Sequence, residues 1–84
     1  VIMLKLINIV KREKVIEADY IPESSNKSAH ISLDIETETY TADNIEEYGT
    51  MYSRMAANGL IRTLKELEYG TKKEVPNERL VMWY

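Results

Sequence analysis

The sequence predicts an α+β fold, a mostly antiparallel sheet of four or five strands with one long helix packed on one face. Three observations support this class. The first ten residues are apolar apart from Lys5 and Asn8, two later segments alternate between apolar and polar residues, and a helical segment precedes a last apolar strand. The resulting order, β-β-β-(β)-α-β, is typical of an antiparallel sheet with a helix across one face. The 84 residues are expected to form a single domain spanning 1–84.

Residues 1–10, VIMLKLINIV, predict a strand that is apolar on both faces. A short Ile, Val and Leu run ended by a polar cluster is typical of a buried strand. A membrane-spanning helix needs about 20 apolar residues, and a signal peptide needs a basic leader and a cleavage site. We therefore expect an interior strand in a soluble, cytoplasmic protein with no membrane segment. Simple alternation places Ile2, Leu4, Leu6 and Val10 on one face and Val1, Met3, Ile7 and Ile9 on the other.

Three further segments before the helix are predicted to be strands. Residues 15–21 and 29–35 alternate between apolar and polar side chains, as in a strand with one buried face and one solvent-exposed face. The KREK segment between the first two strands lacks Gly and Asn, which favours a loose hairpin loop over a tight turn. Pro22 ends the second strand, and a polar loop follows it. Residues 39–42, TYTA, are a candidate for a short fourth strand.

The main helix is expected from about Thr50 to Tyr69. Asn44 stands three residues before Glu47, which is the spacing of a capping box. Gly70 follows the helix where a left-handed stop is common. The last strand is RLVMWY, residues 79–84, and it is apolar on both faces apart from Arg79.

The helix and the sheet both carry more apolar surface than one helix on one sheet face covers. One helix stripe is expected to face the sheet: Ala56, Ala57, Leu60, Ile61, Leu64 and Leu67. A second copy of the chain, in a symmetric homodimer, would cover the remaining surface. The alternative is a strongly twisted sheet that fills its own second face, with Met and Tyr as core filler. The predicted interface comprises a second helix stripe and the terminal strand: Tyr48, Met51, Tyr52, Met55, Trp83 and Tyr84.

The sequence contains no motif that indicates an enzyme. It has no cysteine, a single histidine, His30, and no phosphate-binding, dinucleotide-binding or zinc-protease motif. His30 falls on the predicted solvent-exposed face of a strand, which favours an exposed histidine over a catalytic one. We therefore expect no catalytic residue, no cofactor, no metal and no small-molecule substrate. The function expected is that of a non-enzymatic protein-interaction or regulatory module that self-associates.

Two alternatives from other classes depend on charge. Residues 28–53 contain no Lys or Arg, and their acidic residues would suit Ca²⁺ or Mg²⁺ in a small metal-binding protein or enzyme, although the spacing matches no calcium loop. These residues are Asp34, Glu36, Glu38, Asp43, Glu46 and Glu47. Arg54, Arg62 and Lys65 on the helix would suit a nucleic-acid-associated accessory protein. A net charge of −3 disfavours the nucleic-acid hypothesis.

Overall fold

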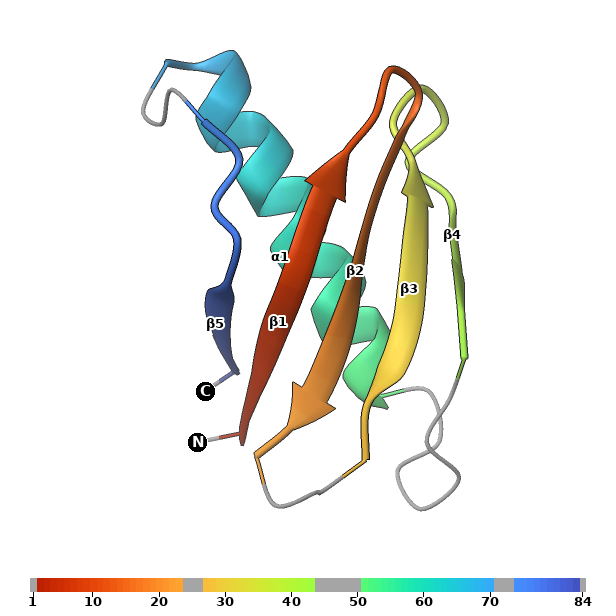
Figure 1. Ribbon diagram of the computed structural model, residues 1–84, viewed down its shortest axis with the longest axis vertical. Helices are drawn as coiled ribbons and strands as arrows, with labels where there is room; N and C mark the ends of the chain where they lie inside the picture. The colour runs from red at the N-terminus through yellow and green to blue at the C-terminus, as the bar shows by residue number, and fades with distance from the viewer. Residues whose placement is uncertain (1, 24–26, 44–50, 71–73, 84) are drawn as a thin grey trace.

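The computed structural model contains a five-stranded antiparallel sheet with one helix across one of its faces (Figure 1). It describes residues 2–23, 27–43, 51–70 and 74–83. The strand order is β4-β3-β2-β1-β5, so the first and last strands of the chain are neighbours. The predicted α+β class and the predicted order of elements are confirmed. The elements are β1 (Ile2–Lys11), β2 (Val15–Pro22), β3 (Ala29–Asp34), β4 (Tyr40–Ala42), α1 (Met51–Glu68) and β5 (Arg79–Trp83).

The core lies between α1 and the face of the sheet that the helix covers. Strands β1, β2 and β3 each contribute alternate side chains to this layer, as the period of two requires. The largest fully buried aromatic is Tyr20, whose hydroxyl donates a hydrogen bond to the Asp43 carbonyl oxygen at 2.6 Å. Burying a large aliphatic side chain contributes about 1.5–3 kcal/mol. The strand side of the core comprises Leu4, Leu6, Ile9, Ile16, Ala18, Tyr20, Ile31 and Leu33.

A bulge in β1 overturns the simple alternation expected for the first strand. Asn8 has a left-handed backbone with φ of 53°, and the pairing with β2 shifts register between Ile7 and Val10. Asparagine tolerates this conformation better than most residues, and a bulge inserts one extra residue on its strand. Ile9 therefore joins the core and Val10 is exposed, so the faces predicted for these two residues were wrong.

The turn between β3 and β4 is held by Asp34. Its Oδ1 accepts hydrogen bonds from the backbone N–H groups of Glu36 at 2.9 Å and Thr37 at 3.1 Å. Asp34 N also donates to the Thr39 carbonyl oxygen at 2.8 Å, which closes the hairpin. The fourth strand expected over residues 39–42 is present as β4, a short strand at one edge of the sheet.

Helix α1 buries a stripe that is displaced from the predicted one. Ala56, Ala57 and Leu60 lie in the core as expected, and Tyr52 and Met55 join them. The other members of the predicted stripe are only half-buried: Ile61, Leu64 and Leu67. At the C-terminal end, Gly70 adopts the expected left-handed conformation with φ of 75° and donates to the Leu67 carbonyl oxygen at 3.2 Å. The capping residues expected at Asn44 and Glu47 lie outside the described residues.

Gly59 allows the helix to approach β5 closely. A Cβ at this position would lie 2.7 Å from Val81 Cγ2, nearer than side chains pack, and 3.0 Å from Leu6 Cδ1, which is a tight contact. The helix axis therefore lies nearer to the β1–β5 part of the sheet than any larger residue would permit. This contact determines the width of the space between α1 and β5.

The sheet face opposite α1, turned toward the viewer in Figure 1, is the open face. Met3 and Ile7 are half-buried there, and Lys5 is exposed. The expectation that both faces of the first strand are covered is therefore wrong for the single chain as described. On β5, the alternation places Leu80 and Met82 on the open face, 56% and 45% exposed.

Candidate functional site

Strand β5 forms an edge of the described sheet, and its backbone register shows which groups point outward. Glu23 N donates to the Met3 carbonyl oxygen at 3.0 Å, so the polar groups of Met3 point from β1 toward β2. Successive residues of an antiparallel strand direct these groups to opposite sides. Leu4 therefore points toward its β5 partner, Val81. The N–H and C=O of Leu80, next to Val81, are directed away from β1 at the free edge.

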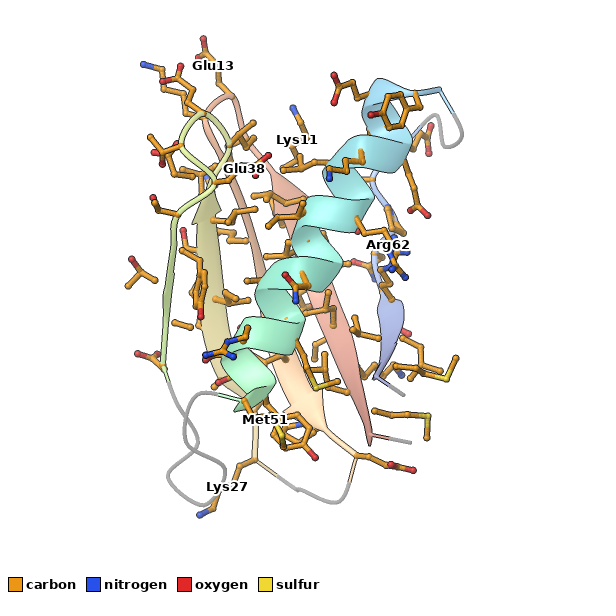
Figure 2. The ribbon with its side chains drawn as sticks, turned by 180° about the vertical axis from the view of Figure 1, so that it is seen from behind. Lys11, Glu13, Lys27, Glu38, Met51 and Arg62 are labelled. Atoms are coloured by element: carbon orange, nitrogen blue, oxygen red, sulfur yellow. The ribbon has the colours of Figure 1, made fainter. Side chains whose placement is uncertain are left out.

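A groove of about 280 Å³ runs between α1 and β5. Met55, Gly59 and Val81 supply apolar lining on the helix side of the sheet, and Asn58, Arg62 and Arg79 are its polar and charged residues. Figure 2, which shows the helix side, places Arg62 beside β5. The lining residues are Met55, Asn58, Gly59, Arg62, Arg79, Leu80, Val81 and Met82.

One of the two arginines in this groove is neutralised by the helix. Arg79 Nη1 and Nη2 donate to Glu66 Oε1 and Oε2 at 2.5 and 3.2 Å, and Nη1 also donates to Thr63 Oγ1 at 3.1 Å. Thr63 Oγ1, which is buried, donates in turn to the Gly59 carbonyl oxygen at 2.9 Å. A two-pronged arginine–carboxylate pair is strong and directional. It explains why a charged residue occupies the helix side of β5, and it holds the strand against α1.

The other arginine has no such partner among the described residues. Arg62 is exposed, and no carboxylate in residues 2–23, 27–43, 51–70 and 74–83 forms an ion pair with it. Asn58, one turn earlier on α1, is also exposed. The groove therefore combines an apolar floor, an outward-facing strand backbone and one cation without an ion-pair partner in the described part of the chain.

A second hollow, of about 230 Å³, lies along the open face over β1 and the end of β2, with Leu80 of β5 at one side. Leu80 lines both this hollow and the groove. At its rim, Lys5 Nζ lies 3.3 Å from Glu78 Oε2. The lining residues are Met3, Leu4, Lys5, Ile21, Pro22, Glu23 and Leu80.

Farther along the open face, β1, β2 and β3 bring three polar side chains together. Asp19 Oδ1 lies 3.0 Å from His30 Nδ1, and Asp19 Oδ2 accepts a hydrogen bond from Asn8 Nδ2 at 3.2 Å. The left-handed bulge residue, Asn8, thus aims its amide at the carboxylate. The carboxylate orients the imidazole, but neither the groove nor the hollow includes any of these three residues.

Acid is expected to lower the stability of the fold through two carboxylates. Hydrogen bonds from His30 and Asn8 lower the pKa of Asp19 below its ordinary value of 3.8. The backbone N–H groups of Thr37 and Glu36 likewise lower the pKa of Asp34 below 3.8. Because both folded-state pKa values lie below the unfolded ones, the stabilisation is complete above the unfolded pKa and is lost as the pH falls through the folded pKa.

Urea unfolding at a series of pH values from about 5 to about 2 measures this loss. The double variant Asp19→Asn, Asp34→Asn is expected to show a shallower decrease in unfolding free energy over this range than the wild type. An equally steep decrease in the double variant would contradict the assignment to these two side chains.

The structure separates the residues of the predicted interface. Tyr52 and Met55 are 7% and 1% exposed and belong to the core, so they are not on the surface of the single chain. Met51 is exposed at the first position of α1 (Figure 2). Trp83 ends β5 and pairs with Ile2, but its side chain lies outside the described part, as do Tyr48 and Tyr84.

Leu80 and Met82 of the terminal strand are not among the interface residues predicted from the sequence. The signal for them was present in RLVMWY, because strict alternation separates Leu80 and Met82 from Arg79 and Val81. What the pattern could not show is which of the two faces the helix covers.

The acidic stretch does not form a row of carboxylates on one strand. Strand β3 ends at Asp34, and the chain turns at Glu36 and Glu38. Glu46 and Glu47 lie outside the described residues. In the part of the chain that the structure describes, no three His, Asp or Glu side chains are grouped so that they could hold a metal ion.

The basic side chains considered for nucleic acid, Arg54, Arg62 and Lys65, are all exposed on α1. Arg62 alone among them lines the groove beside β5. Over the described residues, α1 does not have the length and apolar character required of a helix that crosses a membrane. No protein-family model, curated protein or solved structure matches this chain.

Proposed function

We propose that the protein is a non-enzymatic, cytoplasmic protein-interaction module that self-associates through the open face of its sheet. The observation that carries this proposal is the exposure of Leu80 and Met82, 56% and 45%, on the face opposite the helix. The contact surface is the open-face patch, defined as Met3, Ile7, Ile21, Leu80 and Met82.

The register gathers this patch on three neighbouring strands, around Lys5. Met3 pairs with Met82, and Lys5 lies between Leu80 on one side and Ile21 on the other. Directly paired residues of neighbouring strands stand within contact distance on one face. A contiguous apolar patch of a few hundred Å² is a common mark of an interaction site on a small soluble protein.

A second copy of the chain fits this patch because a two-fold axis places the same surface on itself. Two sheets that pack face to face lie about 10 Å apart and interdigitate their inner side chains. The apolar side chains gather toward the β1–β5 end, whereas Asp19 and His30 lie toward β3 and remain in water at the rim. Tyr52 and Met55, which were predicted to lie in the interface, are buried in the core. We therefore place the proposed contact on the sheet and not on the helix.

The variant Leu80→Lys is expected to convert a dimer into a monomer. A lysine at position 80 would place a charge in the interface without a partner, which is costly. Light scattering after size exclusion, over a wide range of protein concentrations, measures the mass. The free energy of unfolding of the monomer should change by no more than about 0.5 kcal/mol, as for other surface substitutions.

The matched control is Tyr69→Lys, which replaces a side chain that is 75% exposed near the end of α1, away from the sheet. This variant should keep the dimer mass. A wild-type monomer at every concentration, or a dimer that Leu80→Lys leaves intact, would refute self-association through the open face.

A further inference from the structure

We propose that the groove between α1 and β5 binds an extended acidic segment of another protein, which adds a strand to β5 and places a carboxylate against Arg62. This site lies at the edge of the sheet, whereas the self-association proposed above uses its open face. The two proposals rest on different observations and can fail separately.

The backbone of β5 is suited to accept another strand. Its pairing with β1 is regular over all five residue pairs from Ile2–Trp83 to Leu6–Arg79. Natural edge strands are usually protected by proline, a bulge or an outward charge. Strand β5 has no proline, and its charged residue, Arg79, is tied to Glu66 on the helix side. The outward N–H and C=O of Leu80 can therefore form the first backbone hydrogen bonds with an added strand.

The groove matches one half of the alternation of an added strand. Successive side chains of an extended segment point to opposite faces. Those on the helix side would enter the groove of about 280 Å³, and those on the other side would continue the open face beside Leu80. Backbone pairing then supplies affinity and the groove supplies selectivity, as in other cases of strand addition.

Charge determines which segment fits the helix side. Glu66 neutralises Arg79, so this guanidinium positions β5 and is not available to a ligand. Arg62 lines the same groove without an ion-pair partner among the described residues. A carboxylate between the two walls would meet this cation where the apolar floor excludes part of the water, which strengthens the attraction. An acidic side chain on the helix-facing side of the added strand is the complement.

The groove is held open before any ligand binds. Gly59 determines how close α1 lies to Val81. Farther toward the C-terminal end of α1, the hydrogen bonds of Arg79 to Thr63 and Glu66 connect β5 to the helix. A preformed groove reduces the cost of ordering that binding would otherwise impose. The net charge of −3 gives an acidic segment no long-range attraction, so recognition depends on the local cation.

The test uses a fluorescein-labelled, end-capped heptapeptide of alternating valine and glutamate, which places all carboxylates on one side when extended. Fluorescence anisotropy with the wild-type chain should show saturable binding. Arg62→Glu should weaken it by about tenfold or more, the size expected for a charge pair in a partly dry groove. Arg54→Glu makes the same charge change on the same helix outside the groove, and it should change the affinity by less than about twofold.

The backbone part of the proposal has its own test. An added strand presents alternate N–H groups to β5. N-methylation of one alternate set of peptide nitrogens should therefore abolish binding, whereas methylation of the other set should preserve it. The mass of Arg62→Glu by light scattering should equal that of the wild type, which separates this site from self-association.

Three results would overturn the proposal. They are the absence of saturable binding to the wild-type chain, equal losses in Arg62→Glu and Arg54→Glu, or equal effects of the two methylation patterns. The second would mean attraction to overall charge alone, and the third would mean binding without strand addition.

Discussion

Leu60→Ala is expected to lower the free energy of unfolding by about 2–5 kcal/mol, as a large-to-small substitution in a packed core does. Leu60 is fully buried on the side of α1 that faces the sheet, so the shorter side chain leaves a cavity in the core layer between helix and sheet. A chain of this length is expected to have about 4–13 kcal/mol of stability in total. The substitution therefore removes a large share of it. Urea unfolding followed by circular dichroism measures the change.

The matched control is Leu80→Ala, which removes the same atoms from a leucine that is 56% exposed on the open face. At a protein concentration low enough to disfavour self-association, this variant should lose less than about 1 kcal/mol, because the leucine is already half in water. Equal losses in the two variants would mean that α1 does not cover the sheet face assigned to it.

Gly59→Val is expected to destabilise the protein by about 3 kcal/mol, near the upper end of what overpacking costs. The added Cβ would lie 2.7 Å from Val81 Cγ2, and Val81 is a short, stiff side chain that cannot swing aside. The flexible end of Leu6, 3.0 Å away, can move more easily. Thermal and urea unfolding of the variant measure the cost.

A pair of variants separates this steric contact from the weak helix propensity of glycine. In the wild-type background, Gly59→Ala should destabilise, because the contact with Val81 costs more than the gain of about 1 kcal/mol from replacing glycine in a helix. In a Val81→Ala background, the same substitution should stabilise, because the contact with Val81 Cγ2 is gone, the flexible end of Leu6 can move, and the propensity gain remains. A stabilising Gly59→Ala in both backgrounds would contradict the close approach of α1 and β5.

The local patterns in the sequence were sufficient for the type and order of the elements. Alternation over 15–21 and 29–35 reported strands with one covered face, because side chains of a strand point to opposite sides whatever the partner. Gly70 marked the end of the helix, because a left-handed residue is least costly at glycine. The α+β class followed from these elements.

The local pattern failed at Asn8 and at the N-terminal half of the helix. A bulge depends on how β1 pairs with β2 after the turn, so the reversed faces of Ile9 and Val10 had no local cause beyond an asparagine in the strand. Tyr52 and Met55 resembled surplus apolar surface because their burial depends on where α1 crosses the sheet. Both are decided by contacts between segments far apart in the chain.

Local patterns therefore account for the set of elements, their order and most of the positions on each that are buried. Contacts between distant segments establish that β5 pairs with β1 at an edge and that α1 lies close to β5 at Gly59. The same contacts allow Glu66 to neutralise Arg79, while Arg62 has no ion-pair partner among the described residues. The difference is one of distance along the chain. Periodicity and capping act over a few neighbouring residues, whereas the groove and the open face arise from pairing between the two ends of the chain.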